Sequence, residues 1–283
     1  MAKTGNITTE MKHVHITLTT KLFLIVFLFS TSSFVSINTF SQAQIVSNDL
    51  RKHKLILINP GHGGHDSGAI GSSGLSEKDL TLTLAKRLKQ ILTQTYDVYL
   101  TREGDYWLAI ERRTALANHH RCDILVNLHA SGSFHHTARG IAVFYFGYNA
   151  GQGLFIQHRK DLIQSEHRLL PWNHVQSTHT DQSKLLANLV HTKLIESANS
   201  TDRGIHKAPL LVLSGAGMPA ILIEIGYVSH PTEERNLRNP EVISDLARLI
   251  TEGINEYFRQ MSGCIKSEDM IEENMGTGRG AAW

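Results

Sequence analysis

The sequence predicts an α/β fold, with a single domain built on a twisted, mixed and largely parallel central sheet of about six strands flanked by helices. From Leu55 onward, short apolar runs alternate with longer stretches of helical periodicity, which is the order expected when helices connect parallel strands. No internal repeat and no Pro- or Ser-rich linker divides this region. Hydrophobic residues make up 41% of the chain, which is ample for one buried core.

Short apolar runs bounded by polar or turn-forming residues are the predicted strands. In chain order they cover residues 55–59, 98–101, 124–128, 141–146, 210–213 and 220–225.

Helices are expected between these runs. In residues 77–93, Leu80, Leu84 and Leu88 recur on one face, and Ser76 is a suitable N-cap residue. Similar periodicity predicts further helices over residues 108–119, 183–197 and 240–259.

Residues 1–43 are interpreted as a secretory signal peptide. A basic start, an apolar core and small polar residues follow one another, with cleavage expected after Ala43. The apolar core is shorter than the roughly 20 residues of a membrane span, so a retained anchor is only the alternative. Translation can start at Met1 or at Met11. We therefore expect an exported protein of the periplasm, the cell envelope or the extracellular space.

The remaining chain divides into two parts. Residues 44–262 are expected to form the catalytic domain, and residues 263–283, which lack apolar periodicity, a flexible C-terminal tail. Cys122 is expected to be a buried apolar filler, and Cys264 lies in the tail, so no disulfide is predicted between them.

The charge balance excludes one class of partner. Lys and Arg number 28 and Asp and Glu number 26, so the formal net charge is only +2 and gives no electrostatic footprint for nucleic acid.

Four polar residues lie at or just beyond the carboxyl ends of predicted strands, where sites form in α/β sheets. They are His62 and Glu77 after the first strand, His129 after the third, and Glu224 at the end of the last. Two imidazoles and one carboxylate are a common zinc-binding set, with a fourth position left to water. A further carboxylate can then carry a proton between the water and the leaving group.

Each of these residues also has a structural interpretation. His62 lies in "PGHGG", which favours a glycine-rich turn. Glu77 would complement a helix dipole in the first turn, and His129 would be a hydrogen-bonded core histidine. Glu224 is harder to explain structurally, because a carboxylate buried without a partner or a metal costs several kcal/mol.

Three successive blocks of the sequence resemble those of a known enzyme family. They are "INPGHGGHDSGAIGSSGLSEKDLTLTLAKRLKQIL", "YLTREGDYWLAIERRTALANHHRCDILVNLHAS" and "RGIHKAPLLVLSGAGMPAILIEIGYVSHPTEERNL". In this order they resemble the zinc-dependent N-acetylmuramoyl-L-alanine amidases, the amidase type 3 family, from about residue 55 to about residue 258. Several linked blocks in register are more specific than a lone glycine motif.

The resemblance implies a site and a reaction. The zinc ligands of the family fall on His62, Glu77 and His129, and its catalytic glutamate falls on Glu224. One Zn²⁺ per chain is then expected to serve hydrolysis of the amide between the lactyl group of N-acetylmuramic acid and the L-alanine of the stem peptide in peptidoglycan.

Two alternative functions stay open. A zinc peptidase or carboxypeptidase acting on the stem peptide would use the same four groups. A noncatalytic peptidoglycan-binding module on the same scaffold would need none of them for turnover. We expect a monomer, with a protein activator as a candidate partner and with the membrane contacted only through the signal segment.

Further polar residues near the blocks have weaker assignments. Asp66 can orient a ligand by a hydrogen bond or can form an Asx turn. Arg102 and Arg113 are expected to make structural ion pairs. His135 and His136 lie in a loop near His129, where they can line a groove.

Residues 149–182 are the least typical part of the chain. Related enzymes carry a regulatory helix at this place that covers the metal, so Glu166, His167, His174 or His179 is a candidate to reach zinc in a resting state. The alternative is a surface insertion.

Overall fold

The computed structural model describes residues 53–148, 172–197 and 200–276. The predicted signal segment, Glu166, His167 and the end of the predicted tail lie outside these ranges.

The described strands form one mixed sheet, as predicted. They are β1 (Leu55–Pro60), β2 (Asp97–Leu100), β3 (Ile124–Ser131), β4 (Ile141–Phe146), β5 (Asp202–Ala208) and β6 (Ala220–Tyr227). Within the described residues the sheet has six strands in the order β2-β1-β3-β6-β4-β5. All neighbours are parallel except β4 and β6, which run antiparallel.

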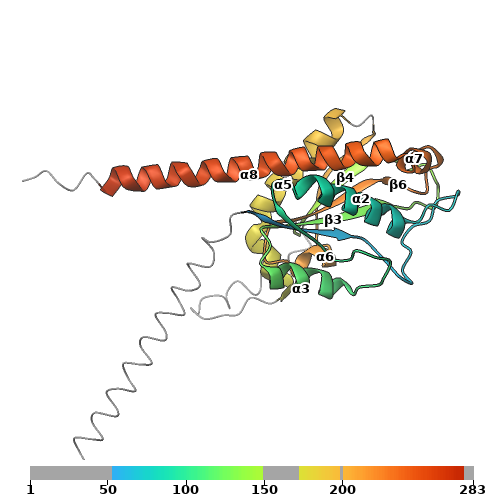
Figure 1. Ribbon diagram of the computed structural model, residues 1–283, viewed down its shortest axis with the longest axis horizontal. Helices are drawn as coiled ribbons and strands as arrows, with labels where there is room; N and C mark the ends of the chain where they lie inside the picture. Colours follow the sequence, from blue (N-terminus) through green and yellow to red (C-terminus); the bar gives the residue numbers. More distant parts are fainter. Residues whose placement is uncertain (1–52, 149–171, 198–199, 277–283) are drawn as a thin grey trace, which may run out of the picture. The chain divides into compact units, whose positions relative to one another are not determined.

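Helices cover both faces of this sheet (Figure 1). They are α2 (Glu77–Leu92), α3 (Ile110–His120), α5 (Thr180–Ser197), α6 (Leu211–Ser214), α7 (Pro231–Leu237) and α8 (Pro240–Gly276), together with the 3-10 helix η2 (Trp172–His179). Apolar residues of α2, α5 and α8 pack on one face, and those of α3 and α6 on the other. None of the helices in the described ranges is long and apolar enough to cross a membrane.

The central strands are buried on both sides, which explains their continuous apolar runs. In β1, Ile56 and Ile58 belong to the core beneath α2, α5 and α8, whereas Leu55 and Leu57 belong to the core beneath α3 and α6. All four residues are buried, and the most exposed of them, Leu55, is 6% exposed. Parallel strands buried in this way all end at one edge, and this edge carries the polar residues identified above.

The strand predicted over residues 210–213 is wrong. These residues form the short helix α6, and Leu213 packs into the smaller of the two cores. The strand at this point of the chain is β5, whose sequence DRGIHKA is polar. A strand at the edge of a sheet has one unpaired side and needs little apolar surface, so β5 has no apolar run to reveal it.

The predicted boundary at residue 262 lies inside a helix, because α8 continues to Gly276. No proline interrupts the chain between Pro240 and Gly276, and residues 263–276 include three Glu and two Met, which favour helices. The expectation of an irregular stretch rested on the missing apolar periodicity of these residues, and helix propensity alone does not need that periodicity.

Helix η2 carries His174 and His179. Its Gln176 donates hydrogen bonds from Nε2 to the carbonyl oxygens of Ala216 (2.9 Å) and Met218 (2.6 Å), just before β6 begins. Glu224 lies toward the opposite end of β6. The structure therefore does not bring His179 to the predicted metal site.

Candidate metal centre

The structure brings together the three predicted metal ligands. His62 follows β1, Glu77 opens α2 and His129 lies in β3. One ligand atom from each of them lies within 4.8 Å of the others. Two imidazoles and a carboxylate at this separation could hold a metal ion.

Glu77 is the central residue of this group. Its Oε1 lies 2.9 Å from Nδ1 of His129 and 3.0 Å from Nε2 of His62, and it accepts a hydrogen bond from the Ala130 amide at 3.0 Å. Its Oε2 accepts from the Ala69 amide at 3.0 Å. Burial opposes ionisation of this 5% exposed side chain, but these partners outweigh burial and hold the pKa of Glu77 well below its usual range.

The structural interpretation of Glu77 also holds. Ser76 caps α2 by accepting a hydrogen bond at Oγ from the Asp79 amide at 3.3 Å, and Glu77 lies in the first turn. The helix start therefore fixes the backbone from which the Glu77 carboxylate reaches the two histidines.

His62 adopts a backbone conformation that is rare for a residue with a side chain, with φ at 59°. Its Nδ1 lies 2.9 Å from Oδ2 of Asp66, whose Oδ1 accepts from the Gly68 amide at 3.1 Å. Asp66 thus combines the two roles considered for it, turning the chain and orienting a ring. Burial lowers the pKa of His62, but Glu77 and Asp66 outweigh it and raise the pKa, so the ring stands in a site that favours a cation.

Glycines make room for the three side chains. A Cβ on Gly61 would lie 2.6 Å from Cε1 of His129, and a Cβ on Gly68 would lie 2.6 Å from Oε2 of Glu77. Gly68 also has φ at +63°. The glycines that suggested only a turn in the sequence are needed because the ligand side chains occupy the space beside them.

Glu224 lies beside this group. On the parallel strands β3 and β6, His129 and Glu224 are direct partners in register. Within the described residues the buried Oε2 of Glu224 has no hydrogen-bond partner. Burial raises the pKa of Glu224 and outweighs the nearby charge of His129. A buried carboxylate oxygen without a partner is costly, which marks it as a group that meets a ligand.

Arg102 and Arg113 are buried, and neither makes the expected ion pair with any residue in the described ranges. Among the described residues they donate mainly to backbone carbonyls. Arg102 Nη2 donates to the oxygens of Gly61 and Lys78, each at 2.7 Å, and Arg113 Nη2 donates to that of His62 at 2.7 Å. A guanidinium carries five N–H donors, so each of these residues can bond several carbonyls at once, in the loop around Gly61 and His62 and, for Arg102, also in the first turn of α2.

The remaining predicted positions lie outside the group of three ligands. Nδ1 of His136 lies 2.9 Å from the carbonyl oxygen of Ser229, in the loop between β6 and α7. His135 is exposed. Cys122 is buried, as predicted, in the core beneath α3 and α6.

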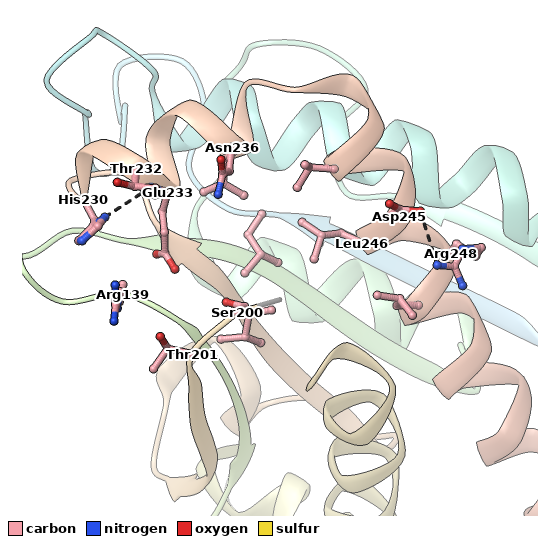
Figure 2. A pocket seen from close by; sticks show the side chains of 15 residues that line it. Arg139, Ser200, Thr201, His230, Thr232, Glu233, Asn236, Asp245, Leu246 and Arg248 are labelled. Carbon is pink, nitrogen blue, oxygen red and sulfur yellow. Dashed lines mark hydrogen bonds and ion pairs between the residues drawn. The ribbon is translucent and has the colours of Figure 1, made fainter. Parts of the chain in front are cut away.

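A separate cavity of about 330 Å³ lies between β4, β6, α7 and α8 (Figure 2). Arg139, Thr201 and His230 contribute to its polar part, and Ile225 and Leu246 to its apolar part. None of His62, Glu77, His129 and Glu224 lines it. The candidate metal centre and this cavity are therefore distinct.

Comparisons with known proteins agree with the geometry. The family model described as N-acetylmuramoyl-L-alanine amidase (Amidase_3) matches residues 56–256. The amidase AmiA of Escherichia coli (strain K12) is 29% identical over 220 residues, which cover 72% of this chain and 76% of AmiA. AmiA of Salmonella typhimurium (strain LT2) is 30% identical over 223 residues, with the same two coverages. The solved catalytic domain of the amidase CwlV from Bacillus (Paenibacillus) polymyxa is similar with a TM-score of 0.60 and 29% identity, covering 73% of this chain and 98% of that one.

Proposed function

Because this chain belongs to the N-acetylmuramoyl-L-alanine amidase family, we propose that it hydrolyses peptidoglycan with one zinc ion held by His62, Glu77 and His129. The bond cleaved is the amide between the lactyl group of N-acetylmuramic acid and the L-alanine of the stem peptide. The observation that carries the proposal is a three-ligand group beside Glu224, whose buried Oε2 has no hydrogen-bond partner among the described residues.

The residues present fit zinc. Two ring nitrogens and one carboxylate oxygen are ligands that zinc takes, and three protein ligands leave a position open for water or substrate. When bound, zinc supplies a Lewis acid for the scissile carbonyl and lowers the pKa of water to about 7. Within the chain, Asp66 accepts a hydrogen bond from Nδ1–H of His62. The lone pair of this ring is then on Nε2, on the side of Glu77.

Glu224 is proposed to move the proton. It takes a proton from the attacking water, whose oxygen bonds to the carbonyl carbon, and it returns the proton to the alanine nitrogen as the C–N bond breaks. The products are the lactyl carboxylate and a stem peptide with a free amino group. The raised pKa of Glu224 makes its carboxylate a stronger base than an exposed glutamate.

Product analysis tests this function against its alternatives. Purified peptidoglycan is digested with the protein, and the products are identified from their masses by mass spectrometry. An amidase releases the intact stem peptide from the glycan, a peptidase shortens the stem, and a noncatalytic module yields no product. Activity should disappear on zinc chelation and return with added zinc, which a noncatalytic module cannot reproduce.

The place of action follows from the substrate. Peptidoglycan lies outside the cytoplasmic membrane, so we propose that residues 1–43 direct export, and the N-terminal sequence of the mature protein tests cleavage after Ala43. Monomeric state, a protein activator and control of metal access by residues 149–182 stay predictions.

A further inference from the structure

Helix α7 carries two adjacent carboxylates that bind two different segments around the metal centre. Glu234 accepts hydrogen bonds from the amides of Ser73 (3.0 Å) and Leu75 (3.1 Å), in the loop that leads to Glu77. Glu233 accepts from the amides of Gly140 and Tyr227, each at 2.7 Å, at the start of β4 and the end of β6. The two side chains thus link α7 to both halves of the site.

The loop held by Glu234 ends at the metal ligand. It is closed by a bridge between Ile70 and Ser76 and by a hydrogen bond from the Gly71 amide to the Leu75 carbonyl at 2.9 Å. At its base the Ala69 amide donates to Oε2 of Glu77. The position of the loop therefore sets both the start of α2 and one hydrogen bond to the Glu77 carboxylate.

The fit between this loop and Glu234 is tight. Ser72 adds a hydroxyl donor at 3.1 Å, and Nη2 of Arg238 lies 3.4 Å from the carboxylate. A Cβ on Gly71 would overlap the Glu234 carboxylate. The Glu234 side chain is only 1% exposed. Its hydrogen bonds within the described residues go to the loop and to Arg238, and to none of the three proposed zinc ligands.

Glu233 has the equivalent relation to Glu224. In Figure 2 it extends from α7 toward β4, beside the cavity. Tyr227 follows Glu224 by three residues on β6, and Gly140 precedes Ala142, the β4 residue that pairs with Glu224. A carboxylate that bonds both amides fixes these two antiparallel strands where Glu224 projects.

We propose that Glu234 is a positioning residue for Glu77, and that Glu233 is a positioning residue for Glu224. This inference rests on the proposed function for the roles of Glu77 and Glu224. It assigns separate consequences to two neighbouring residues of the same type: loss of Glu234 weakens metal binding, and loss of Glu233 slows turnover with the metal in place.

The test compares Glu234→Gln and Glu233→Gln with Glu241→Gln, a matched change at an exposed residue of α8. Zinc affinity is measured by competition with a chromogenic chelator, below the unfolding temperature of every variant. We expect Glu234→Gln to raise the zinc Kd roughly tenfold, as for other residues that support a ligand. Its kcat at saturating zinc should return to within about threefold of wild type.

Glu233→Gln should leave zinc affinity unchanged and lower kcat, the opposite of Glu234→Gln. Its zinc Kd stays within about twofold of the control, while kcat falls roughly tenfold or more at an unchanged KM, because a displaced proton carrier slows chemistry and not binding. Equal zinc Kd values for Glu234→Gln and Glu241→Gln would overturn the role of Glu234. A wild-type kcat for Glu233→Gln would overturn that of Glu233.

Two further experiments test the role of Glu234 if Glu234→Gln does not fold or if the enzyme cleaves another bond: a milder substitution, and a measurement that needs no substrate. If Glu234→Gln does not fold, Ser72→Ala removes one bond to Glu234 and should still raise the zinc Kd, and an unchanged Kd counts against the proposal. Hydrogen exchange at the Ala69, Ser73 and Leu75 amides should speed up in Glu234→Gln even if the enzyme cleaves another bond. Failure of the amidase assay in wild type would therefore contradict the proposed function without deciding the role of Glu234.

Discussion

His129 and Glu224 are direct neighbours on the parallel strands β3 and β6. Neighbouring strands lie about 4.8 Å apart, and residues in register project from the same face of a sheet. A register irregularity follows at once, between His129 and Ser131. One strand pair therefore holds a predicted metal ligand beside the carboxylate proposed to move the proton, and the spacing does not depend on a loop.

Asp66→Asn should weaken zinc binding. The amide oxygen of Asn carries no charge, so it is a weaker acceptor than a carboxylate for the hydrogen bond from Nδ1–H of His62. The His62 ring is then less firmly oriented and less basic. We expect zinc affinity to fall by about 10- to 100-fold. Chelator competition measures this, with Asp97→Asn at an exposed position of β2 as the control. Equal affinities in the two variants would show that Asp66 serves only the turn.

Gly61→Ala should displace the His129 ring. The added Cβ would lie 2.6 Å from Cε1 of His129, and we expect destabilisation of roughly 1–3 kcal/mol together with loss of zinc. The control is Gly104→Ala, whose Cβ would meet only the Tyr106 ring at an ordinary contact distance of 3.5 Å. Unfolding and zinc content are measured for both. A Gly61→Ala variant that binds zinc normally would contradict the packing described here.

Arg102→Leu should lower the free energy of unfolding by about 3 kcal/mol, because the carbonyls of Gly61 and Lys78 lose the guanidinium and, among the described residues, keep only the Thr81 hydroxyl as a side-chain donor. Arg112→Leu, at an exposed position of α3, should change it by less than about 0.5 kcal/mol. Urea denaturation compares the two. Similar values would mean that water or other donors replace the guanidinium at no cost.

Glu234 should make stability depend on pH in the acid range. Burial raises its pKa, but the hydrogen bonds from Ser73, Leu75, Ser72 and Arg238 outweigh this and lower the pKa from 4.5 to about 2. The stabilisation is therefore complete above about pH 4.5 and is lost as the pH falls toward 2. A shift of this size corresponds to about 3 kcal/mol.

The measurement is the free energy of unfolding of wild type minus that of Glu234→Gln, followed from pH 7 to pH 2. This difference should narrow below about pH 4.5. A difference that stays constant over the range would show that the charge of Glu234 does not contribute to stability.

The sequence predicts the elements that carry apolar patterns and misses those that do not. The helix over residues 77–93 ends one residue earlier in the structure, and β4 has the predicted bounds. The polar edge strand β5 and the short helix α7 have no comparable pattern and were not found. Polar groups at the ends of buried strands point to His129 and Glu224, whereas Glu77 opens a helix and is assigned as a ligand only through the family resemblance.

The hydrogen bonds that surround the site residues could not be predicted from the sequence. The bonds from Arg102 and Arg113 to loop carbonyls join segments about 40 to 50 residues apart, and Glu234 binds a loop about 160 residues before it. Only the folded chain shows that these charged residues bond mainly to backbone amides or carbonyls. The left-handed conformation of His62 could not be predicted either, because the neighbouring glycines are sufficient to explain a turn.

The most direct test of the account is to measure bound zinc and released stem peptide for Glu224→Gln beside wild type. Both proteins are incubated with the same purified muropeptides, and the zinc bound per chain is determined by elemental mass spectrometry. We predict that Glu224→Gln holds as much zinc as wild type and releases stem peptide at least roughly a hundredfold more slowly, since it cannot carry the proton. Near-normal release by the zinc-loaded variant would contradict the assignment of Glu224.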